Sequence, residues 1–193
     1  QSASTFGTLA ITGANVAVTE NAAMDLGAST ISGTASFNST SNAITDSGTL
    51  AITGATTLNS GSADITLNEA ASTFGTLAIT GTNVAVTENA AMDLGASTIS
   101  GTASFNSSNN AITDSGTLAI TGVTTLNSGS ADLTLDEAAS TFGALAITGA
   151  NVAVTENAAM DLGASTISGT ASFNSTSNAI TDSGTLAITG ATT

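Results

Sequence analysis

A nearly identical long repeat constrains the fold of this chain more than any other feature of its sequence. Residues 3–70 and 71–138 differ at six positions, and the third unit, residues 139–193, is incomplete. One string, F-G-(T/A)-L-A-I-T-G, begins at each of three equally spaced phenylalanines, Phe6, Phe74 and Phe142, and their spacing sets a period of 68. A fixed period of this kind is typical of arrays in which each unit packs against the next. Residues 1–193 are therefore predicted to form a single continuous array.

Within each unit, apolar residues alternate with small or polar residues over short segments, as at Leu9 and Ile11 and at Val16 and Val18. A period of two is typical of β-strands, whose successive side chains point to opposite faces. Clusters of Gly, Asn, Asp and Ser separate these segments, and such residues favour tight turns. No segment shows the apolar spacing of an amphipathic helix. The sequence therefore predicts an all-β chain.

Three sub-units fit into each repeat, because the string T-L-A-I-T-G at residues 8–13 returns at residues 49–54. They span residues 3–27, 28–48 and 49–70, an average of roughly 22–23 residues. Three short strands and three turns in this length describe one coil of a parallel β-helix, in which coils stack about 4.8 Å apart. We expect three coils in each repeat and a rod on the order of 40 Å long. The absence of proline suits strands that are paired on both edges.

The charged residues exclude several classes of function. The chain has 14 Asp and Glu and no Lys, Arg or His, so its net charge is −14. Without cations it cannot neutralise phosphates, and we expect neither a nucleic-acid partner nor attraction to an anionic membrane surface. Without Cys and His it lacks the usual zinc ligands, thiol nucleophiles and imidazole bases, so no cofactor is expected. No apolar run approaches the roughly 20 residues of a transmembrane helix.

The acids recur at equivalent positions of every unit, which in the first unit are Glu20, Asp25, Asp46, Asp64 and Glu69. We interpret them as a dilute, solvated anionic surface that keeps a rod soluble. A second hypothesis is that Asp25 and Asp46 stack on neighbouring coils and bind Ca²⁺ through carboxylate oxygens. Glu20 and Asp25 are also a candidate pair for glycoside hydrolysis. The same pair recurs in identical surroundings, however, and no Lys or Arg is present to hold a substrate, so we expect no enzyme activity.

Two surface features suggest further hypotheses. The glycosylation motif N-x-(S/T) occurs three times, at Asn38, Asn106 and Asn174, and these residues are candidate acceptors. Threonines such as Thr8 and Thr12 are expected to point outward, as on the flat face of an ice-binding solenoid. Their stacking partners vary between Ala, Asn and Thr, which makes ice binding a minor alternative.

Four strings resemble the repeats of large bacterial exoproteins of the filamentous haemagglutinin type. The resemblance covers the whole chain and is most visible in A-I-T-D-S-G-x-L, S-A-D-I-T-L-N, N-V-A-V-T-E-N-A and D-L-G-A-S-T. The resemblance implies a right-handed parallel β-helix, secretion from a Gram-negative cell by the two-partner route, and a role as a surface fibre or adhesin.

The sequence therefore predicts an extracellular structural fibre built by stacking β-solenoid coils. Neither end of the chain carries the atypical polar repeat that caps natural arrays, so we expect either end-to-end self-association or continuation into a longer array. An alternative is the stalk of a cell-surface adhesin, whose binding site would lie in a separate tip. Functional amyloid is a further alternative, in which strands stack between chains rather than within one chain.

Overall fold

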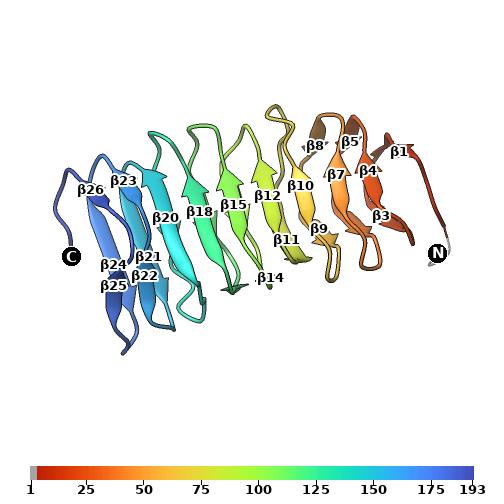
Figure 1. Ribbon diagram of the computed structural model, residues 1–193. Helices are drawn as coiled ribbons and strands as arrows, with labels where there is room; N and C mark the ends of the chain where they lie inside the picture. The colour runs from red at the N-terminus through yellow and green to blue at the C-terminus, as the bar shows by residue number, and fades with distance from the viewer. Residues whose placement is uncertain (1–3) are drawn as a thin grey trace.

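A computed structural model describes residues 4–193, which form a rod of stacked parallel strands without a helix (Figure 1). Every strand pair between successive coils is parallel, as in a β-solenoid. The longest ladder runs through ten strands in line, so nine turns separate its first strand from its last. The prediction of an all-β parallel β-solenoid is confirmed.

The strands belong to three sheets. The twelve-stranded sheet contains β1 (Thr8–Leu9), β4 (Met24–Leu26), β7 (Ile44–Asp46), β10 (Ile65–Leu67), β12 (Val84–Thr87), β15 (Ala103–Asn106), β18 (Val123–Asn127), β20 (Ala144–Gly149), β22 (Met160–Leu162), β23 (Ser165–Ile167), β25 (Ile180–Asp182) and β26 (Leu186–Ile188). The eleven-stranded sheet contains β3 (Val16–Thr19), β6 (Ala35–Asn38), β9 (Thr56–Asn59), β11 (Thr76–Gly81), β13 (Met92–Leu94), β14 (Ser97–Ile99), β16 (Ile112–Asp114), β17 (Leu118–Ile120), β19 (Leu133–Leu135), β21 (Val152–Glu156) and β24 (Ala171–Ser175). The small sheet contains β2 (Thr12–Gly13), β5 (Ser29–Ile31) and β8 (Leu50–Ile52).

Each coil has two sides, because the chain passes alternately through the two large sheets. In most coils one side is long and the other is short. A short side is one strand, such as β15. A long side is two short strands in line, such as β13 and β14, which both pair with the single strand β11. The small sheet holds the second halves of such long sides and therefore continues the twelve-stranded sheet at the N-terminal end.

The prediction of three coils per repeat is wrong. In the two large sheets, residues that pair on successive coils lie between 17 and 21 positions apart, as for Thr76↔Asp93 and Ile112↔Leu133. One 68-residue period, residues 74–141, contributes seven sides, at residues 76–81, 84–87, 92–99, 103–106, 112–120, 123–127 and 133–141. Two sides make one coil, so a repeat contains three and a half coils of about 19 residues rather than three coils of 22–23.

The odd number of sides makes successive repeats exchange faces. Strand β11 lies in the eleven-stranded sheet, whereas its equivalent one repeat later, β20, lies in the twelve-stranded sheet. On the eleven-stranded face three short sides are followed by three long sides, and on the twelve-stranded face three short sides are followed by two long sides. Strand β11 or β20 lies between the two kinds, because it pairs with a short side on one edge and with a long side on the other. We call these two strands the switch strands. Whatever one repeat presents on one face, the next repeat presents on the opposite face.

The core is a set of apolar columns along the rod axis. One column runs through Val18, Phe37, Leu58 and Ile79, and its equivalent in the other sheet runs through Val86, Phe105, Leu126 and Ile147. Except for Val18, which is partly exposed, these side chains are 0–2% exposed. Burying one such side chain contributes about 1.5–3 kcal/mol, so the columns are the main source of stability. The described residues include no helix long and apolar enough to cross a membrane.

Candidate functional site

One glutamate in each repeat lies inside the rod rather than on its surface. Glu20, Glu88 and Glu156 are each 0% exposed. Glu20 and Glu88 directly follow a short side, and Glu156 is the last residue of one. On the next two coils the positions equivalent to that of Glu88 are the buried serines Ser107 and Ser128. The serine hydroxyls donate to carbonyls of their own turns, at 2.5 Å to Asn110 O and 2.9 Å to Ala131 O. The glutamates must find a partner farther away.

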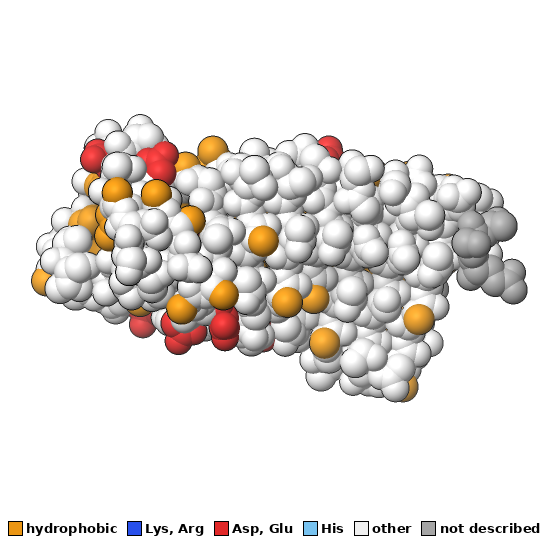
Figure 2. All heavy atoms as spheres, turned by 90° about the horizontal axis from the view of Figure 1, so that it is seen from below, with side chains coloured by type: hydrophobic (Ala, Val, Ile, Leu, Met, Phe, Trp, Pro, Cys, Tyr) orange, Lys and Arg blue, Asp and Glu red, His pale blue; other side chains and the backbone are white. Residues whose placement is uncertain are grey.

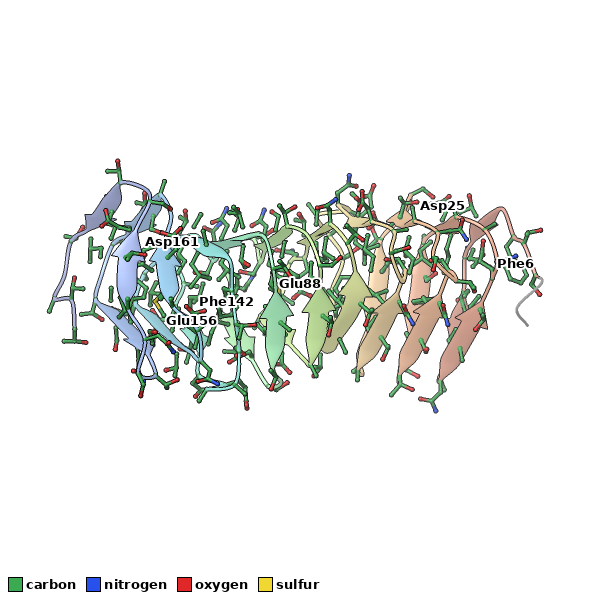
Figure 3. The ribbon with its side chains drawn as sticks, turned by 60° about the horizontal axis from the view of Figure 1, so that its bottom comes forward. Phe6, Asp25, Glu88, Phe142, Glu156 and Asp161 are labelled. Carbon is green, nitrogen blue, oxygen red and sulfur yellow. The ribbon has the colours of Figure 1, made fainter. Side chains whose placement is uncertain are left out.

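That partner is the backbone of the phenylalanine that begins the repeat. Glu88 Oε2 accepts a hydrogen bond of 2.9 Å from Phe74 N. Glu156 Oε2 accepts one of 3.0 Å from Phe142 N, and both residues of this second pair are labelled in Figure 3. Among residues 4–193 the other carboxylate oxygen, Oε1, has no hydrogen-bond partner in either residue, although it is buried. Phe74 and Phe142 are only 5% and 6% exposed, so both contacts are sealed from solvent.

The first copy of this contact is incomplete in the part of the chain that the structure describes. Neither carboxylate oxygen of Glu20 has a hydrogen-bond partner there. Phe6, the equivalent of Phe74, is 47% exposed. The two later copies therefore define the site.

Burial changes the protonation of these glutamates. It raises the pKa of Glu88 from 4.5 to about 8, although the hydrogen bond from Phe74 N opposes this shift. Burial likewise raises the pKa of Glu156 to about 7, against the opposing hydrogen bond from Phe142 N, and it also raises the pKa of Glu20. The chain has no Lys, Arg or His that could compensate a buried negative charge. Glu88 is therefore mostly protonated at neutral pH.

The interpretation of every acid as a solvated surface charge is wrong for these glutamates. Val16, Val18 and Glu20 alternate with the period of a strand, so Glu20 is in phase with residues of the core. This alternation is the sequence signal for an inward-pointing Glu20 side chain. The opposite expectation, that a lone carboxyl remains in water, follows from the high cost of burying an unpaired charge.

Asp25 and Asp93 point outward and accept hydrogen bonds from neighbouring coils. Asp93 Oδ2 lies 2.7 Å from Thr76 Oγ1 and 2.8 Å from Ser115 Oγ, on the coils before and after it. Asp25 accepts hydrogen bonds in the same way from Thr8 and Ser47. These carboxylates bridge three successive coils.

Asp46 and Asp114 cap the backbone of the following coil. Asp114 accepts hydrogen bonds from the N–H groups of Asp136 and Glu137 at 2.8 and 3.4 Å, and Asp46 accepts equivalent bonds at 2.8 and 3.2 Å. Burial raises the pKa of the Asp114 carboxyl, and the negative charges of Asp136 and Glu137 add to this effect while their N–H groups oppose it. These carboxylates connect one long side to the loop above it.

The structure does not bring the two calcium candidates together. Asp25 pairs in register with Thr45, and Asp46 pairs with the buried Leu26. Side chains of adjacent residues in a strand point to opposite faces, so the two carboxylates lie on opposite sides of the sheet. No group of three or more acids that could hold a metal ion occurs among residues 4–193. Calcium binding stays a prediction that the structure does not favour.

The candidate hydrolytic pair, Glu20 with Asp25, recurs one repeat later as Glu88 with Asp93, and the structure separates its two carboxyls. Glu88 is buried against Phe74, whereas Asp93 is half-buried and bonded to hydroxyls on the outer surface. A hollow of about 660 Å³ near the C-terminal end is lined by Asp182, Ser183, Gly184, Thr185 and Leu186, and it contains a single carboxyl. Neither place offers the two converging acids that glycoside hydrolysis needs.

The three glycosylation candidates lie at the ends of short sides. Asn38 and Asn106 each use Oδ1 to accept a hydrogen bond from the backbone N–H two residues on, at 3.0 and 3.1 Å. They pair with Asn59 and Asn127 on the next coil. Asn174 lies exposed within β24. Their modification stays a prediction.

Small side chains cover most of the outer faces. One outward column runs through Ala85, Ser104, Thr125 and Ala146. In Figure 2 isolated hydrophobic side chains are scattered over the visible face, acidic side chains form small groups, and no basic side chain is present. The threonines do not form an unbroken ladder, since Thr30 pairs with Thr12 on one side and Ala51 on the other.

A family model described as "Repeats of unknown function (DUF5649)" matches three consecutive segments, residues 13–80, 81–148 and 149–193. The two complete segments are equal in length to the internal period of the sequence. Together the three segments cover nearly the whole chain. No curated protein and no solved structure matches it.

Proposed function

Because the chain belongs to the family of repeats of unknown function (DUF5649), we propose its role from its own structure: a stiff structural rod in an extracellular fibre. The observation that carries this proposal is that polar side chains form hydrogen bonds between neighbouring coils. The hydroxyls and carboxylates of Thr76, Asp93, Ser115 and Asp114 are bonded to neighbouring coils rather than presented to a ligand. A rod cross-linked in this way along its axis resists bending.

Uniformity along the rod supports a mechanical role over recognition of one specific ligand. The first two units differ at six positions, and the side-chain contacts of Asp25 recur at Asp93. A binding site for a single partner needs one place that differs from the others. A structural rod can use the same contact again in successive repeats.

The location of the rod rests on the resemblance of its strings to secreted exoproteins of the filamentous haemagglutinin type. On that basis we place the rod outside a bacterial cell, at or near its surface, as part of a longer array or a self-associating fibre. The alternative role is the stalk of an adhesin whose contact with other cells is made by a separate tip.

Length measurements on chains with different numbers of repeats test the rod. Each added unit should lengthen the particle by on the order of 17 Å, since it adds three and a half coils at the usual strand spacing. Small-angle X-ray scattering on chains of two, four and six units should therefore give a maximum dimension that grows linearly with the number of units. Growth as the square root of that number would contradict a rigid rod.

Antibody labelling tests the location. An antibody against the repeat should label intact source cells, and the label should disappear after the cells are treated with an external protease. Permeabilised cells serve as the control. Labelling that appears only after permeabilisation would contradict an extracellular role. It would not contradict the proposal that the chain forms a rod.

A further inference from the structure

We propose that Glu88 and Glu156, with Glu20 as the third copy, are proton-operated latches that hold the rod together in acid and weaken it as the pH rises. Each of the two complete latches consists of a buried glutamate and the backbone N–H of the phenylalanine 14 residues before it, and Glu20 is the buried but incomplete copy among the described residues. The proposal adds pH control to the rod and does not depend on where the rod is located.

The latch lies where the solenoid changes faces. Phe74 comes two residues before the switch strand β11, and Glu88 follows β12, the first short side after it. The coil is short here, because Asn89 N donates to Ser72 O across the same sequence separation of 17 that joins Thr76 to Asp93. The latch therefore joins the corner before the switch strand β11 to the corner before β13, which pairs with β11 on the next coil.

The buried carboxyl is only half satisfied. Oε2 of Glu88 accepts a hydrogen bond from Phe74 N–H, and Oε1 has no partner in the part of the chain that the structure describes. A protonated carboxyl in this position is neutral and can be buried at moderate cost. An ionised one places a full charge in the core with a single hydrogen bond, which is far more costly.

No charged group around the latch relieves that cost. The strands on either side of β12, β10 and β15, carry no titratable side chain. The loop before β11 carries Glu69, and β13 carries Asp93, which faces outward. The corresponding groups around Glu156 are Asp136, Glu137 and Asp161. All of these groups are acids, so any charge on them opposes ionisation of the latch.

The sign of the pH effect follows from the raised pKa. An unfolded glutamate titrates near 4.5, whereas folded Glu88 and Glu156 titrate near 8 and 7. Between these values the folded chain holds protons that the unfolded chain has released. The stabilisation is complete below about pH 4.5 and is lost progressively as the pH rises to about 8.

Urea unfolding of the 193-residue chain between pH 5 and pH 9 tests the latch. At a fixed urea concentration, each latch should raise the unfolding equilibrium constant about tenfold per pH unit from pH 5 towards its folded pKa. Glu88→Gln keeps the shape and the acceptor for Phe74 N but cannot ionise. It should remove one such factor and make the chain more resistant to urea than the unmodified chain at pH 8 and above.

The matched control is Asp182→Asn, which also removes one acid but changes an exposed side chain outside the latches. This variant should keep the pH dependence of the unmodified chain. If Glu88→Gln shifts the urea midpoint equally at every pH, its role is a plain hydrogen bond and the proposal is wrong.

Carboxyl ¹³C NMR of the unmodified chain gives a second readout that does not require the variant to fold. At least two of the 14 acids should titrate above pH 6. Titration of all 14 below pH 6 would overturn the proposal.

Discussion

The third repeat lacks a side-chain contact that the second repeat makes, and this difference arises from a single residue. Thr76 donates its hydroxyl proton to Asp93, whereas the equivalent of Thr76 in the third repeat is Ala144, which faces Asp161 without a hydroxyl. Both aspartates lie in the middle of a Met-Asp-Leu strand with the same burial pattern. Substitutions at these two equivalent positions therefore measure how much this hydrogen bond contributes to the free energy of unfolding.

Thr76→Ala should destabilise the chain by about 0.5–1.5 kcal/mol, the usual net value of one hydrogen bond, and Ala144→Thr should stabilise it by a similar amount. Urea unfolding at pH 6 measures both changes. Thr98→Ala is the control, because Thr98 is an exposed strand threonine of the same rod. An effect of Thr76→Ala no larger than that of Thr98→Ala would assign the loss to strand propensity instead of the hydrogen bond.

Among the elements, the long sides depend on contacts that the short sides do not need. A short side is a continuous strand, whereas a long side contains a kink that breaks its ladder. At Gly116, within the long side 112–120, an added Cβ would overlap the backbone N of Ala96, so the kinks of successive coils lie in direct contact. Asp114, just before this kink, holds the loop of the next coil through two N–H groups.

Asp114→Ala should release the loop at residues 136–137 while leaving the core columns in place. The backbone N–H groups of Asp136 and Glu137 would lose their acceptors, at a cost of about 1–3 kcal/mol. Hydrogen exchange at these two amides should become at least several-fold faster. Asp182→Ala is the matched control, because no side-chain hydrogen bond to Asp182 occurs in the described chain and exchange at residues 136–137 should not change. Unchanged exchange in Asp114→Ala would show that the cap does not hold the loop.

The whole molecule has two equivalent faces, because seven sides per repeat make successive units alternate. The chain has no cysteine, so single labels can be introduced without background. Ser36 and Ser172 lie on strands of the eleven-stranded sheet, and Ser104, midway between them in sequence, lies on the twelve-stranded sheet. Rods decorated through these positions report directly on the alternation.

Pairs of cysteine substitutions carrying gold labels should distinguish the two arrangements by electron microscopy. Ser36→Cys with Ser104→Cys should place labels on opposite sides of the rod, and Ser36→Cys with Ser172→Cys should place both on one side. A solenoid with three full coils per repeat would place all three labels on the same side. That result would contradict the register described above.

The sequence predicted the fold better than the site. Alternation at residues such as Val84 and Val86 identified the strands, and the unbroken period identified the stacking. From the sequence, a surface position is predicted for the buried glutamates, because burying an unpaired carboxylate carries a high free-energy cost. Only the pairing of Glu88 with a backbone N–H across the corner shows how that cost is reduced.

The sequence by itself determined that this chain forms parallel strands in a repeating, all-β array, because the alternation along each strand and the long period are both properties of the order of residues. The tertiary structure decided how many coils a repeat contains. Ser115 and Gly116 have the composition of a corner, yet in the rod they form a kink within one side, because their backbone packs against the kink of the preceding coil. A turn residue changes the chain direction locally, but only the neighbouring coil determines whether that change begins a new face.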